Sequence, residues 1–112
     1  MPHPTDTAIE AEIVAKGLTA PRVTPGRVAV LMARVQFKFH VEGTSTFCRH
    51  AFLDGDFFLA TGHSACVSKE NFDAELGRKI AQDNVVKPTG DKLWELEGYA
   101  LRERLRQFYL GA

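Results

Sequence analysis

The chain has 112 residues, of which 45% are hydrophobic and 25% are charged, as in ordinary soluble globular proteins. The 14 lysines and arginines balance the 14 aspartates and glutamates, so the chain lacks the positive excess that drives binding to a phosphate backbone, and we expect no nucleic-acid partner. The length suits a single domain over residues 1–112, with disorder confined to the ends, residues 1–5 among them.

No segment of the sequence is typical of export or of a membrane. The opening residues, MPHPTDTAIEAE, lack the basic head and apolar run of a signal peptide. No stretch approaches the roughly 18 consecutive apolar residues of a membrane-spanning helix. With two cysteines, Cys48 and Cys66, expected to stay thiols, these features favour a cytoplasmic protein with no membrane partner.

Two short helices are predicted at the start. Asp6 or the threonine before it can cap a helix that reaches about residue 16, where Gly17 can take the left-handed conformation that ends helices. After the break LTAPRVTPG, Thr24 followed by Pro25 is typical of an N-cap with proline in the first helical position. That second helix should extend to about Arg34.

Three strands joined by short turns should follow. Apolar and polar residues alternate in VQFKFHV (35–41), as in a strand with one buried face. FCRHAFL (47–53) and FFLAT (57–61) come next, separated from each other by DGD (54–56), a hairpin signal of the Asp-Gly type. Connections this short require an antiparallel sheet.

Two further helices are predicted after the sheet. Apolar residues recur every four positions from Phe72 and indicate a helix over 69–86. The sequence KPTGD (87–91) should end it, with Asp91 capping a last helix that reaches about residue 109. The predicted fold class is therefore α+β, with two N-terminal helices, a three-stranded antiparallel sheet and two C-terminal helices in a single domain.

Two glycines lie inside the predicted C-terminal helices and indicate positions of close packing. Glycine in a helix costs about 1 kcal/mol relative to alanine, so Gly77 and Gly98 suggest close approach by another backbone or an aromatic ring. The sheet also has edges that these helices need not cover, and the chain has eight Phe. We therefore expect a homo-oligomer.

A run of arginines near the end is the best candidate for a local positive patch. Arg102, Arg104 and Arg106 surround Glu103, and residues two apart on a helix do not share a face. The pattern therefore predicts a solvated helix surface.

The stretch TGHSACVSKENFDAELGRK (61–79) most invites a functional interpretation. A nucleophile elbow would need a glycine where Cys66 stands, and nothing marks an orienting partner or an oxyanion hole for a cysteine nucleophile, so we expect no enzyme. The structural interpretation is that Ser68 caps the helix. The functional interpretation is that the loop at 62–68 and nearby aromatic rings hold a small anionic ligand. Its candidate residues are Gly62, His63, Ser64, Ser68, Trp94 and Tyr99.

A zinc site is a further alternative. Cys48 and His50 lie two apart on a predicted strand, and His63 and Cys66 return on the far side of a hairpin. Tetrahedral zinc accepts this ligand set, although the spacing matches no common zinc finger. Because buried cysteines usually act as small hydrophobic residues, we predict no metal and no cofactor, with these four residues kept as the candidate ligands.

Three segments together carry a family resemblance: EAEIVAKGLTAPRVTP, GHSACVSKENFDAELGRKIA and KLWELEGYALRERL. Through them the chain resembles a family of small bacteriophage proteins named after products of the N-four and Sf-six phages. The resemblance implies an accessory protein of a phage or prophage that acts in the cytoplasm of the bacterial host. It implies no reaction and no catalytic residues.

Three hypotheses follow from the fold pattern and the resemblance. The first is a non-enzymatic binding protein that modulates a host protein. The second is a protein that binds or sequesters a small nucleotide signal through the candidates at 62–68 and the aromatic rings. The third is a zinc-stabilised interaction module.

Overall fold

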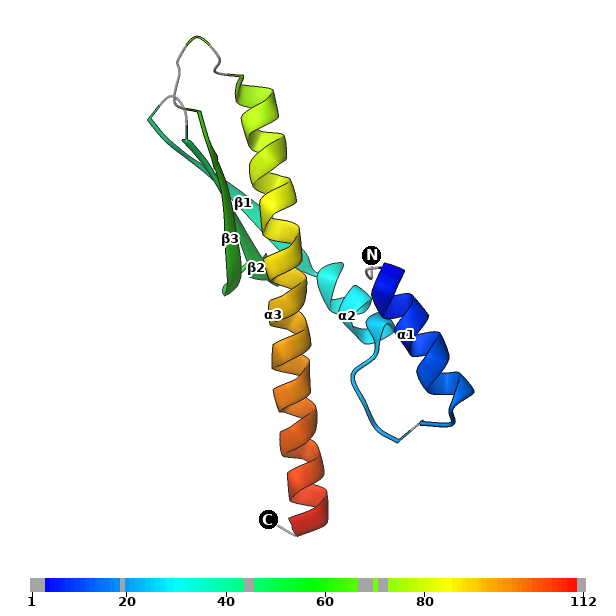
Figure 1. The fold of residues 1–112 in the computed structure, drawn as a ribbon. Helices are drawn as coiled ribbons and strands as arrows, with labels where there is room; N and C mark the ends of the chain where they lie inside the picture. Colours follow the sequence, from blue (N-terminus) through cyan, green and yellow to red (C-terminus); the bar gives the residue numbers. More distant parts are fainter. Residues whose placement is uncertain (1–3, 19, 44–45, 67–69, 71–72, 111–112) are drawn as a thin grey trace. The chain divides into compact units, whose positions relative to one another are not determined.

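The computed structural model describes residues 4–18, 20–43, 46–66, 70 and 73–110. The fold is α+β, with an antiparallel three-stranded sheet, as the sequence predicted (Figure 1). The elements in chain order are α1 (Pro4–Ala15), α2 (Pro25–Met32), β1 (Val35–Glu42), β2 (Thr46–Leu53), β3 (Phe57–Ala65) and α3 (Ala74–Leu110). The chain forms two compact units, one comprising residues 1–33 and 93–112 and the other residues 34–92.

The first unit contains the two short helices. The predicted cap of the first helix at Thr5 or Asp6 is wrong, because α1 begins at Pro4 and both residues lie in its first turn. The end of α1 and the start of α2 follow the sequence signals. Gly17 has a φ of 71°, and its N–H donates to the carbonyl of Val14, so it ends α1 in the left-handed conformation. Thr24 Oγ1 accepts a hydrogen bond from the backbone N–H of Arg27 at 3.2 Å, which makes Thr24 the N-cap of α2. Within this unit Val28, Leu31 and Leu93 are buried.

The second unit is built around the sheet, whose strand order is β1-β2-β3. Each strand pairs with its neighbour in the sequence, with Phe37 opposite Ala51 and Ala51 opposite Ala60. The Asp-Gly signal forms the predicted hairpin turn, in which Asp54 and Gly55 have φ values of 55° and 85°. Two successive residues at positive φ are what a tight hairpin turn of the right twist requires.

The N-terminal half of α3 packs against one face of this sheet (Figure 1). Contacts with the helix come from β2 and β3. The fully buried side chains of this unit include Ala51, Ala81 and Val85. Gly77 meets the expectation of close approach, because a Cβ added there would lie 2.5 Å from ring carbons of Phe47. A Cβ added to Gly98 would meet no heavy atom within 4 Å among the described residues outside its own stretch of helix, so Gly98 does not meet this expectation.

The prediction of two C-terminal helices is wrong, because α3 continues from Ala74 to Leu110 with Pro88 inside it. An interior proline loses one helical hydrogen bond and clashes with the preceding turn, which costs roughly 3 kcal/mol. One side of the turn that contains it is nevertheless buried, since Thr89 and Val85 are both 0% exposed, whereas Pro88 itself is exposed. The Thr89 hydroxyl donates to the Val85 carbonyl at 2.6 Å. Burial of Val85 and Thr89 outweighs the local preference of KPTGD to end a helix.

The start of α3 also differs from the prediction of a helix from residue 69. The helix begins at Ala74, and Asp73 caps it by accepting a hydrogen bond from the N–H of Leu76 at 3.0 Å. The proposed cap Ser68 lies outside the described residues. In the described part of the chain, no helix is both long enough and apolar enough to span a membrane.

Candidate functional site

The stretch expected to be a loop is mostly strand. β3 extends to Ala65, so Gly62, His63 and Ser64 lie in the sheet and pair with β2. The expectation of a loop over 62–68 is therefore wrong for residues 62–65, because strand pairing continues past the segment FFLAT. Strand residues alternate between the two faces, so the three candidates cannot all point toward one ligand.

Two of these candidates serve the packing of α3 on the sheet. Gly62 is buried, and a Cβ added to it would lie 2.4 Å from the backbone nitrogen of Val85 and 2.6 Å from the carbonyl oxygen of Ala81. Ser64 Oγ donates to the carbonyl oxygen of Gly77 at 2.7 Å. Both residues thus face the helix, and the hydroxyl of Ser64 already has an acceptor.

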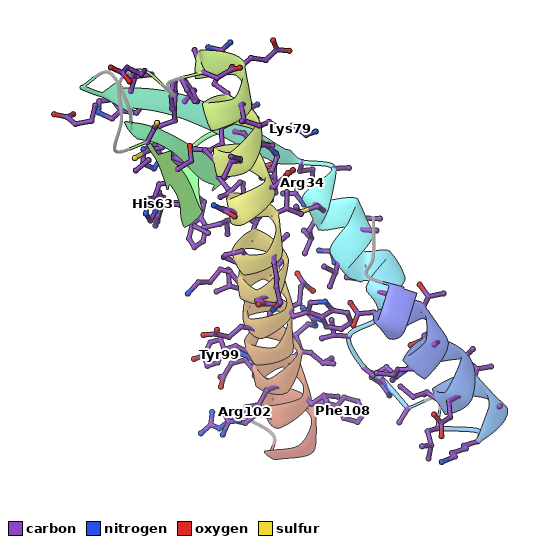
Figure 2. All side chains as sticks on the ribbon, turned by 45° about the horizontal axis from the view of Figure 1, so that its top comes forward. Arg34, His63, Lys79, Tyr99, Arg102 and Phe108 are labelled. Atoms are coloured by element: carbon purple, nitrogen blue, oxygen red, sulfur yellow. The ribbon has the colours of Figure 1, made fainter. Side chains whose placement is uncertain are left out.

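His63 points to the other face of the sheet, and its side chain is exposed (Figure 2). Its backbone carbonyl accepts a hydrogen bond from Asn84 Nδ2 at 2.9 Å. Because Gly62 and Ser64 face the helix, His63 is the one strand candidate whose side chain points to solvent on the open side of the sheet. Ser68, the fourth candidate near this strand, lies outside the described residues.

The aromatic candidates Trp94 and Tyr99 lie on α3. They are five positions apart in the sequence, which places them about 140° apart around a helix. Trp94 is half-buried, whereas Tyr99 is 64% exposed. Both belong to the unit of residues 1–33 and 93–112, while Gly62, His63 and Ser64 belong to the other unit.

The candidate zinc ligands are partly brought together. Cys48 lies directly opposite His63 on the neighbouring strand, and His50 follows on the same face. The Nδ1 of His50 lies 2.8 Å from Thr61 Oγ1, while Cys66 is half-buried beyond the end of β3. Within the described ranges, no three His, Cys, Asp or Glu side chains lie close enough to hold a metal ion.

The face of the sheet opposite α3 carries polar and aromatic side chains, and we call it the open face. Residues directly opposite each other on antiparallel strands share a face, so the register defines four rows across it. These rows are Gln36, Phe52 and Phe58; Lys38, His50 and Thr61; His40, Cys48 and His63; and Glu42, Thr46 and Ala65. The open face therefore includes two phenylalanines, one lysine and three histidines, together with Glu42, whose carboxylate lies 3.1 Å from His40 Nε2.

An aromatic cluster lies at one end of the open face. The rings of Phe52 and Phe58 meet edge to face with centroids 5.7 Å apart. Lys38 Nζ lies 4.7 Å from the centroid of the Phe52 ring and donates to the carbonyl of Gly55 at 3.0 Å. Phe58 is 55% exposed. We call Lys38, Phe52 and Phe58 the open-face cluster.

Sequence reasoning missed this cluster, although a signal was present. Phe52 lies two residues after His50 and four residues after Cys48. Alternation along the strand therefore places all three side chains on one face. The thiol and imidazole groups of Cys48 and His50 give a more distinctive chemical signal than the phenyl ring. Phe58 joins the cluster through a shift of register near Ala51 and Phe52, which the sequence does not reveal.

An ion pair fixes the turn next to this cluster. Arg34 donates to both carboxylate oxygens of Asp54, with Nε to Oδ1 at 2.9 Å and Nη2 to Oδ2 at 2.6 Å. The hydrogen bond from Arg34 lowers the pKa of the Asp54 carboxyl. The N–H of Asp54 also donates to the carbonyl of Arg34 at 3.1 Å, so backbone and side chains join the two residues.

The sequence model of the phage protein (N4 Gp49/phage Sf6 gene 66) family matches residues 5–105. The match includes the three strands, the open-face cluster and most of α3. It confirms the resemblance seen in the sequence. No curated protein and no solved structure matches the chain.

Proposed function

The chain belongs to the phage protein family of N4 Gp49 and phage Sf6 gene 66, and from this membership we propose that it is a small phage or prophage accessory protein that binds and modulates a host protein. It acts in the cytoplasm of the bacterial host and catalyses no reaction. The open face of the sheet is the surface that we assign to the host protein.

One observation carries this proposal: the open-face cluster exposes aromatic rings on a rigid strand pair. Phe58 is 55% exposed, and Phe52, whose ring it contacts on the same face, is half-buried. Exposed aromatic groups beside polar residues are typical of the centre of protein interfaces, where they contribute much of the binding energy. The hydrogen bonds of β2 with its neighbours and the packing of α3 hold the backbone beneath these rings in place.

The alternative of a small anionic ligand has less support. It rests on the histidines and Lys38 of the open face, whereas Gly62 and the hydroxyl of Ser64 are engaged with α3. Nucleotides added to the purified protein would raise its melting temperature if this alternative holds. The zinc alternative predicts instead that a chelator unfolds the protein.

Site-specific photo-crosslinking in host cells tests the proposal. A photoreactive residue at Thr61 on the open face should give one discrete adduct, whereas the same group at Arg78, exposed on α3, should not. The captured protein is then identified by mass spectrometry, purified and titrated against the purified chain. We expect stoichiometric binding in this second step.

A matched pair of substitutions gives the control. Phe58→Asp should abolish the adduct and the binding, whereas Leu76→Asp, at a side chain that is 52% exposed on α3, should preserve both. Equal effects of the two substitutions, or an adduct that does not bind after purification, would argue against the open face as the binding surface.

A further inference from the structure

The C-terminal part of α3 presents a stripe of exposed residues, Glu95, Tyr99, Arg102 and Arg106, which we call the outer stripe. Spacings of four, three and four residues place these side chains within about 60° of one another around a helix. All four are exposed, with Tyr99 at 64% and the side chain of Arg102 at 68%. Figure 2 shows Tyr99 and Arg102 on the same side of the helix.

The outer stripe faces away from the buried side of the same helix segment. Leu93, which is 1% exposed, lies about 160° around the helix from Glu95. Glu97, on the same side as Leu93, pairs with Arg27 of α2 at 3.3 Å within this unit. The stripe is therefore not used in packing the unit to which it belongs.

The charges of the outer stripe are unbalanced along its length. Arg102 and Arg106 are one turn apart and carry like charges, an arrangement that destabilises a helix. Arg102 contacts Glu103 at 2.9 Å, but among the residues that the structure describes neither Glu95 nor Arg106 has an ion-pair partner. One end of the stripe is acidic and the other is basic.

A second copy of the chain would place the acidic end of one stripe opposite the basic end of the other if the two helices run antiparallel. A twofold axis that passes between residues 100 and 101 brings Glu95 of each copy opposite Arg106 of the other. The same axis brings Tyr99 opposite Arg102, where the guanidinium can lie over the phenol ring. A parallel pair would instead place Arg102 opposite Arg102 and Arg106 opposite Arg106.

We propose that the outer stripe is a self-association surface through which two copies of the chain pair as antiparallel helices. A twofold interface of this kind requires that one patch be complementary to itself, and the outer stripe meets this requirement at both of its residue pairs. From Glu95 to Arg106 the stripe is only about 17 Å long, so the interface is small and the dimer forms in a concentration-dependent way.

Sedimentation equilibrium of the full chain at low ionic strength tests this proposal. The wild-type protein should associate to a dimer, and 0.5 M salt should weaken the association because the interface depends on charge pairs. Arg106→Glu places like charges at two symmetric positions and should weaken dimerisation about tenfold or more, because two attractive charge pairs become repulsive.

Two further variants make the result specific. Arg104→Glu alters the net charge equally but lies on the opposite side of the helix, so it should leave dimerisation unchanged. The double variant Glu95→Arg with Arg106→Glu exchanges the charges and should restore dimerisation. A monomeric wild-type protein, equal weakening by Arg104→Glu, or failure of the double variant to recover would each overturn the proposal.

Discussion

Gly62 of β3 lies against the backbone of Val85 on α3, so closely that an added Cβ would be 2.4 Å from the Val85 nitrogen. The carbonyl oxygen of Ala81 would be 2.6 Å away. Since both atoms belong to the helix backbone, no side-chain rotation can make room. The absence of a side chain at residue 62 therefore sets how near α3 approaches the sheet.

Gly62→Ala should destabilise the protein because the helix must move away from the sheet. Overpacking of this kind typically costs about 1–3 kcal/mol, and we expect the upper part of that range. Urea denaturation followed by circular dichroism measures the change. The control is Gly90→Ala, where an added Cβ would meet no described atom within 4 Å beyond its own turn of helix, so alanine should stabilise the helix by up to about 1 kcal/mol. Equal effects at the two glycines would contradict the close contact.

Gly77→Ala should also destabilise the protein, through the ring of Phe47. The added methyl group would lie 2.5 Å from two ring carbons, and Phe47 is only 3% exposed. In a Phe47→Leu background the same substitution should lose its cost, because the ring edge is absent. Denaturation of the four proteins in this cycle should give a coupling energy of about 0.5–3 kcal/mol. Additive effects would show that the two residues do not interact.

Pro88→Ala should stabilise the protein, because it restores an N–H donor inside a continuous helix. The gain should be roughly 1–3 kcal/mol, within the difference between proline and alanine in a helix interior. Pro88 is exposed, so its replacement removes little packing. If residues 87–91 instead formed a break between two helices, the substitution would leave stability unchanged or lower it. Thermal unfolding distinguishes these outcomes.

The Arg34–Asp54 pair should make stability depend on pH in the acid range. The pKa of Asp54 is lowered in the folded protein, so its contribution is present above the ordinary aspartate pKa of about 3.9 and is lost as pH falls through the lower, folded value. Asp54→Asn keeps a residue type that tolerates positive φ but removes the charge. The stability difference between wild type and this variant should therefore shrink below about pH 4.

A matched measurement on Arg34→Gln completes this test. The variant leaves Asp54 in place but removes the guanidinium that lowers its pKa. We expect it to show the same reduced acid dependence as Asp54→Asn. A pH profile that retains the wild-type slope in either variant would contradict this origin of the acid dependence.

The sheet could be predicted from the sequence because its signals are local. Apolar and polar residues alternate over 35–41, which indicates a strand with one buried face. The Asp-Gly pair at 54–55 supplies the positive φ values that the turn requires. Gly77 could be recognised as a packing position because a helix tolerates glycine poorly. Gly98 is also a glycine inside a helix, but in the part of the chain that the structure describes no atom beyond its own turns would meet an added Cβ within 4 Å. A glycine in a helix therefore does not by itself identify a contact.

The parts that could not be predicted depend on contacts between distant residues. Pro88 is a helix breaker by local preference, and burial of Thr89 and Val85 becomes visible only in the folded unit. Gly62 was interpreted as part of a ligand loop because nothing in its neighbourhood of the sequence indicates α3. Ser64 and His63 look equally available in the sequence, and only the strand register shows that they face opposite sides.

The order of the strands has a consequence for folding. Because β1, β2 and β3 pair with their neighbours in the sequence through short turns, the sheet forms without closing a long loop and should fold fast. During synthesis these strands precede α3, so the side that contains Phe47 and Ala51 remains exposed until residues 74–92 have left the ribosome. A chain truncated before α3 would thus expose both faces of the sheet and be prone to aggregation.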